Sequence, residues 1–147
     1  MKEAKRTIAS RPGRQRGSSI LELILVMPIL LMLGFGIVDY GYFFYVKNTL
    51  QGAAQSGART AISASAANSD VNTTISNILT AAGMQNSNYV VTTSPADIST
   101  AAAGASVTVT VSATWSNIGL HTLSSGYGGI SNSKQIVGTA IMRKESN

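Results

Sequence analysis

Residues 20–38 read ILELILVMPILLMLGFGIV, and this stretch decides the fold. A single charged side chain, that of Glu22, interrupts an otherwise uncharged run. A helix needs about 20 consecutive apolar residues to cross a hydrocarbon core of roughly 30 Å. We therefore expect residues 20–38 to form a transmembrane helix.

Glu22 needs an explanation, because an acid inside a membrane segment is costly. Insertion scales give about 2.5–3.5 kcal/mol for an acidic residue at the centre of the bilayer, and less near an interface. One interpretation is functional, since intramembrane acids usually mark a site. The other is a glutamate near the membrane surface whose carboxylate reaches back to water.

The basic residues are concentrated before the apolar run. The chain has a net charge of +5, and residues 2–16 contain six lysines and arginines against one acid, while the rest of the chain is balanced. The positive-inside rule places the N-terminus in the cytoplasm and the residues beyond Asp39 outside. Because the excess charge belongs to the leader, we expect membrane lipid and no nucleic acid as a partner.

The N-terminus does not fit an ordinary secretory signal peptide. Such a signal has an apolar core of about 7–15 residues followed by a small-residue cleavage site. Here the apolar run is longer, and the small residues Gly17, Ser18 and Ser19 precede it. Cleavage at these residues would leave the apolar segment on the mature chain.

This arrangement resembles the prepilin-type signal of type IV pilin-like proteins. The leader ends in Gly17, cleavage would fall before Ser18, and Glu22 would be the fifth mature residue. The apolar helix, the segments 39–41 and 53–59, and the closing residues 140–145 are similar to the TadE family of tight-adherence pilus systems.

The resemblance implies a non-enzymatic pilin-like subunit, a minor pilin or pseudopilin, that prepilin peptidase cuts between Gly17 and Ser18. Glu22 would pair with the new amine of a neighbouring subunit during assembly. Other partners would be pilin-like subunits and the pilus assembly platform of the bacterial inner membrane. The chain would cross this membrane once and enter the extracellular pilus after assembly. The alternative is an unprocessed, single-span, membrane-anchored binding module with its head outside the cytoplasm.

Two further residues of the N-terminal region are candidate sites. Pro28 lacks a backbone donor, so we expect a kink or a locally loosened helix, which either stretches during packing or is a passive bend. Arg59 is a candidate contact with a partner subunit, and a solvated helix charge is the alternative.

The exported part begins with the second half of the same helix. Apolar and small residues repeat at steps of three and four from Val46 to Ile62, which predicts a helix that continues to about Ala64. The aromatic side chains of residues 40–45 suit a membrane interface or contacts with a folded domain. We assign residues 1–17 to the leader, 18–39 to the transmembrane half of the helix, 40–66 to its amphipathic half and 67–147 to the head.

The head is predicted to be α+β, with a three-stranded antiparallel sheet or a slightly larger one. Residues 71–82 form an amphipathic helical pattern, which Asp70 caps at its start and Gly83 at its end. Strands are expected at 89–93, 105–115 and 135–143, with strict alternation in the second. Residues 116–133 are rich in Gly and Ser and are expected to form a long loop.

Catalytic and metal-binding patterns are absent from the sequence. The chain has no cysteine and a single histidine, His121, in the Gly/Ser-rich stretch. A lone histidine in such a stretch is usually a surface residue. We therefore expect no enzymatic activity and no cofactor.

Overall fold

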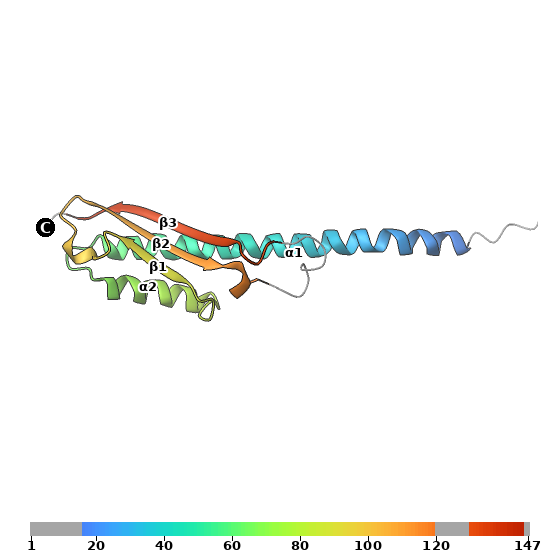
Figure 1. Cartoon of the computed structure of the whole chain (residues 1–147), viewed down its shortest axis with the longest axis horizontal. Coiled ribbons are helices and arrows are strands. Elements are labelled where there is room, and N and C mark those ends of the chain that lie inside the picture. Colours follow the sequence, from blue (N-terminus) through green and yellow to red (C-terminus); the bar gives the residue numbers. More distant parts are fainter. Residues whose placement is uncertain (1–15, 120–129, 146–147) are drawn as a thin grey trace, which may run out of the picture. The chain divides into compact units, whose positions relative to one another are not determined.

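The computed structural model of the chain describes residues 16–119 and 130–145 (Figure 1). His121 and the central part of the loop predicted at 116–133 lie outside the described residues. The elements follow in the order α1 (Arg16–Ala61), α2 (Asn68–Ala81), β1 (Val90–Ser94), the 3-10 turn η1 (Ile98–Thr100), β2 (Ser106–Thr114), the 3-10 turn η2 (Trp115–Asn117) and β3 (Gln135–Arg143). This is the predicted α+β fold.

The chain divides into two compact units after Gly34. The first contains the beginning of α1, where every side chain described from Ser19 to Leu33 is exposed. From Ser19 onward, α1 is long and apolar enough to cross a membrane, with a mean hydropathy of 2.5 over its most apolar window. The predicted long helix is confirmed, although it ends at Ala61 and not at Ala64.

The second unit contains a three-stranded antiparallel sheet in the order β1-β2-β3. The register places Thr110 of β2 opposite Thr92 of β1 and Thr139 of β3. The predicted strands are therefore confirmed, with β3 at its predicted bounds and β1 one residue later than expected.

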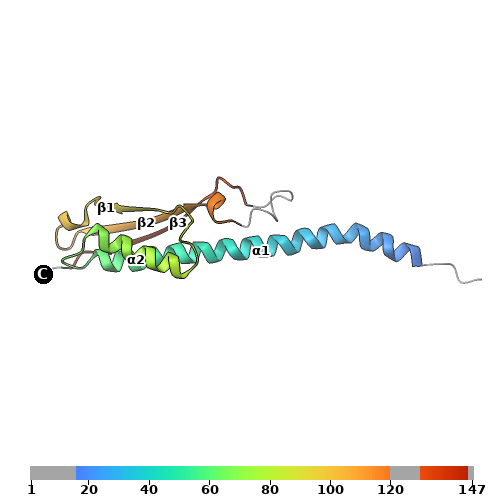
Figure 2. The ribbon, with the colours of Figure 1, turned by 90° about the horizontal axis from the view of Figure 1, so that it is seen from below.

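Within this unit, the sheet forms one layer, and α2 and the C-terminal half of α1 form the other (Figure 2). The side of β2 that faces the helices is apolar, because every second residue from Val107 to Ala113 is buried. The helical stripe that begins at Val46 supplies the opposite wall, with alanines at most of its later positions. Small side chains let the two layers approach closely.

Two glycines show how close this approach is. A Cβ atom on Gly138 of β3 would collide with the backbone carbonyl of Leu50 in α1. A Cβ atom on Gly57 of α1 would lie 2.8 Å from Cδ1 of Ile75 in α2. The sheet and α2 therefore both pack directly on α1.

The ends of α2 match the prediction in part. Gly83 has a φ of 74° and follows the helix, as expected, and Met84 N–H donates to the Leu79 carbonyl at 2.7 Å. This is a Schellman ending, for which glycine is suited because it adopts positive φ without strain. The prediction that Asp70 caps the start of the helix needs correction. Asp70 lies inside the first turn and accepts a hydrogen bond from the N–H of Ala67, which is the N-cap residue.

The predicted strand at 105–115 also needs a correction at its end. Trp115 leaves the strand and begins η2, although it stays on the buried side. Its N–H still donates to the Lys134 carbonyl at 2.8 Å, so the hydrogen bonding toward the start of β3 continues past the strand.

Candidate functional site

The predicted processing residues lie at the beginning of α1. Gly17 and Ser18 belong to its first turn, and the structure describes side chains from Ser19 onward. The first four N–H groups of a helix have no acceptor within the helix. The Gly17–Ser18 bond is therefore in the part of α1 that has the fewest hydrogen bonds to lose.

Glu22 lies one turn further along α1, and its side chain is exposed. Its neighbours Leu21 and Leu23 are also largely exposed, at 71% and 59%. Within the described residues, no hydrogen bond or ion pair is formed by the Glu22 carboxylate. Large exposed apolar patches mark contacts with a membrane or with another protein. The exposed apolar beginning of α1, with its single acid, therefore has the character of such a contact surface.

Pro28 lies inside α1, and the helix is continuous through it. Proline lacks the N–H that would bond the carbonyl of Ile24, so α1 lacks one backbone hydrogen bond at this position. The expected kink or loosening stays a prediction.

Arg59 is exposed in the last turn of α1. A basic side chain there interacts favourably with the negative end of the helix dipole. No acidic partner of Arg59 is found among residues 19–119 and 130–145. The structure thus leaves both the contact with a partner subunit and the solvated charge open.

The aromatic residues of α1 divide into two groups. Tyr42 and Phe43 are half-buried, and their ring centroids lie 6.0 and 5.7 Å from that of Trp115. Tyr40 and Phe44 are exposed, and the Phe44 ring lies 5.8 Å from that of Phe43. Packing on the head therefore applies to the first pair, and the membrane-interface interpretation remains for the second.

Asp39 is the residue whose environment the sequence interpretation missed. In the sequence it marks the outer end of the membrane segment and belongs to the TadE-like segment 39–41, yet its side chain is 2% exposed. Within the part of the chain that the structure describes, neither carboxylate oxygen has a hydrogen-bond partner. A signal was present in the spacing, because Asp39 lies seven residues before Val46 and so continues the buried stripe toward the N-terminus.

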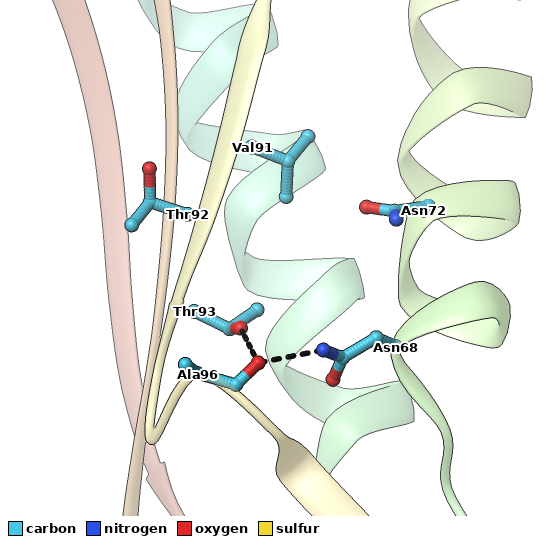
Figure 3. Close-up of a pocket in the computed structure, with 6 residues that line it drawn as sticks. All are labelled: Asn68, Asn72, Val91, Thr92, Thr93 and Ala96. Atoms are coloured by element: carbon cyan, nitrogen blue, oxygen red, sulfur yellow. Dashed lines mark hydrogen bonds between the residues drawn. The ribbon is translucent and has the colours of Figure 1, made fainter.

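A pocket of about 260 Å³ lies between α2 and β1 (Figure 3). Its lining is uncharged and consists of Asn68, Asn72, Val91, Thr92, Thr93 and Ala96. The Asn68 amide is already used, because its Nδ2 donates to the Ala96 carbonyl at 2.6 Å and its Oδ1 accepts from Ile98 N–H. The lining offers no ionisable group for acid–base chemistry.

The charged groups near η1 have structural partners. The pKa of the Asp97 carboxyl is lowered because the Ser99 hydroxyl and backbone N–H both donate to it. Lys144 is 7% exposed, and its Nζ donates to the Ile98 carbonyl at 2.7 Å. Among the described residues, no group of three or more His, Cys, Asp or Glu side chains is arranged to hold a metal ion.

Comparison with known proteins adds one finding. Residues 17–59 match the sequence model of a family described as TadE-like protein. No curated protein and no solved structure gives a significant match. The matched segment contains all the candidate residues of α1, and the match is to the family that the sequence resembles. The match and the apolar helix fit a membrane protein associated with a tight-adherence pilus.

Proposed function

We propose, from the TadE-like segment at residues 17–59, that this chain is a pilin-like structural subunit of a tight-adherence type IV pilus. It is a minor pilin or pseudopilin without enzymatic activity. Prepilin peptidase removes residues 1–17, and α1 then anchors the chain in the bacterial inner membrane as a single span. The head lies outside the cytoplasm, and the pilus assembly platform inserts the subunit among other pilin-like subunits.

One observation carries this proposal: the first part of α1 is apolar and exposed, and it contains one acid five residues after Gly17. A surface of this kind is covered either by lipid or by other apolar helices. A pilin-like subunit uses both covers in turn, first the bilayer and then the helical bundle of the filament.

Cleavage explains the place of Glu22. It creates an ammonium group on Ser18, which lies four residues before Glu22 on nearly the same helix face. Both charges are then surrounded by apolar side chains. The cost of removing the carboxylate and the amine from water is offset only when the two groups pair. Pairing between two subunits therefore selects one axial register.

Two other positions have roles in the same proposal. Pro28 gives α1 a point where the helix can adapt during packing, because neighbouring helices can bond the freed carbonyl. Arg59 is exposed at the end of α1 and contacts an acidic group of a neighbouring subunit.

Mass spectrometry of the membrane-extracted protein from its native host tests the proposal. We expect a mature N-terminus at Ser18, and a Gly17→Leu variant should keep its leader. A wild-type protein that starts at Met1 or Lys2 would contradict the proposal and support the unprocessed binding module. Immunogold labelling of sheared filaments then tests whether the processed protein enters the pilus.

A further inference from the structure

Asp39 is a buried carboxylate without a partner among residues 19–119 and 130–145. Its side chain is 2% exposed, and neither oxygen receives a hydrogen bond. A buried charge is normally paired, because its removal from water is otherwise uncompensated. The unpaired carboxylate therefore points to a group that the described part of the chain does not supply.

The basic side chains that the structure describes do not supply this group. Lys47 lies on the same helix but eight residues away, which is about 12 Å along the axis. Lys144 donates its Nζ hydrogen bond to the Ile98 carbonyl. No ion pair joins Asp39 to these residues or to Arg59, Lys134 and Arg143.

The surroundings of Asp39 restrict what can bind there. Tyr42 and Phe43, which are half-buried, follow one turn later on the same helix face as Asp39. The flanking residues Val38 and Tyr40 are about half exposed and apolar. A cation that reaches the carboxylate must pass an apolar surface, which suits a charge at the end of a long aliphatic stem.

We propose that Asp39 is a second assembly site, at which the carboxylate binds a lysine or arginine side chain of a neighbouring pilin-like subunit. This inference rests on the proposed function. The site differs from Glu22 because it lies at the start of the compact unit formed by residues 35–147. The incoming cation neutralises a buried charge that destabilises the isolated subunit, so the unpartnered carboxylate favours assembly.

The test separates stability from assembly. We would compare the Asp39→Leu and Asp39→Asn variants with the wild type as full-length, detergent-solubilised proteins. Removal of an unpartnered buried charge should raise the Tm of Asp39→Leu by at least about 4 °C. The same variants should be at least about tenfold depleted from sheared filaments, because the incoming cation would be left unpaired. Asp39→Asn keeps the shape of the side chain and covers the case in which leucine does not fit.

A matched control is the Asp70→Asn variant in α2. Asp70 accepts a hydrogen bond from Ala67 N–H, so its loss should lower the Tm slightly and leave filament incorporation unchanged. A lowered Tm for both Asp39 variants would overturn the proposal, because it would show a stabilising partner within the chain. Incorporation of both at the wild-type level would overturn it as well. Absence of the wild-type protein from filaments would instead refute the proposed function, so the two failures are distinguishable.

Carbodiimide coupling of intact wild-type filaments gives a direct readout for lysine. The reagent joins a carboxylate to an adjacent amine as an amide, with water taken up by the carbodiimide. We expect a peptide in which Asp39 is linked to a lysine of another subunit. A link from Asp39 to Lys47 or Lys134 of the same chain would overturn the proposal.

Discussion

The side-chain amide of Gln51 forms two hydrogen bonds with the backbone of Thr139. Its Nε2 donates to the Thr139 carbonyl at 2.8 Å, and its Oε1 accepts from the Thr139 N–H at 3.2 Å. Since β2 pairs with the other side of β3, the glutamine occupies the free edge of the sheet as a neighbouring strand would. A helix side chain thus ties α1 to the last strand and covers part of an edge that is open to pairing with other chains.

The first prediction concerns this tie. Gln51→Leu should lower the free energy of unfolding by about 1–2 kcal/mol, because two hydrogen bonds are lost. Urea unfolding of the detergent-solubilised protein measures the change. Gln55→Leu is the matched control, since Gln55 is exposed one turn later on α1 and should change stability by less than about 0.5 kcal/mol. Equal effects of the two substitutions would show that the tie contributes nothing.

The second prediction concerns the contact between Gly138 and Leu50. Gly138→Ala should destabilise the protein by about 1–3 kcal/mol or more, because the added Cβ meets the rigid backbone of α1. Gly52→Ala provides the contrast, since nothing lies within 4 Å of its Cβ position and alanine favours the helix. Thermal unfolding should show a lower Tm for the first variant and a higher one for the second. A stable Gly138→Ala protein would contradict the close packing of β3 on α1.

The third prediction concerns the pH dependence at Asp97. Its pKa is lowered from 3.8 by the hydrogen bonds from Ser99, so the carboxylate stabilises the fold above the unfolded value. This contribution is lost as the pH falls through the lowered pKa. The Tm of Asp97→Asn should therefore be below that of the wild type at pH 7, and the difference should shrink as the pH is lowered through and below 3.8. A difference that does not depend on pH would assign the effect to side-chain shape.

The fourth prediction concerns Glu22. Glu22→Ala should still insert and be cleaved after Gly17, because the leader and the apolar run are unchanged, yet it should fail to assemble. Mass spectrometry checks the mature N-terminus, and immunoblots of sheared filaments check incorporation. Glu145→Ala, an exposed acid of the head, serves as the control and should assemble normally. Normal assembly of Glu22→Ala would refute the pairing with the Ser18 amine.

Most of the fold follows from periodicity in the sequence. The alternation from Val107 to Ala113 predicted the buried face of β2, because each side of a strand meets one environment. The stripe that begins at Val46 predicted which face of α1 is buried, since residues three and four apart share a helix face. These signals can be read from a short window of sequence, because every residue on the buried face makes the same kind of apolar contact.

The differences arise where a residue's environment depends on distant segments. The burial of Asp39 and the division between Tyr42 and Tyr40 are set by how the head covers α1, which no short window of sequence reports. Asp70 was predicted as a cap from its residue type, whereas the chain preceding α2 enters one turn earlier and makes Ala67 the N-cap. The candidate residues of the signal, Gly17, Ser18 and Glu22, are predicted from a resemblance to prepilin-type signals, and their roles depend on partners outside this chain.

The contact between Gly138 and Leu50 also governs when folding can finish. Because β3 rests on α1, a ribosome or translocation channel must release the chain through residue 143 before the core can close. A fragment that stops before residue 135 would expose the alanine-lined wall of α1 to solvent. Expression of the head alone, beginning after Ala61, would remove α1 and leave α2 as the helix that covers the sheet.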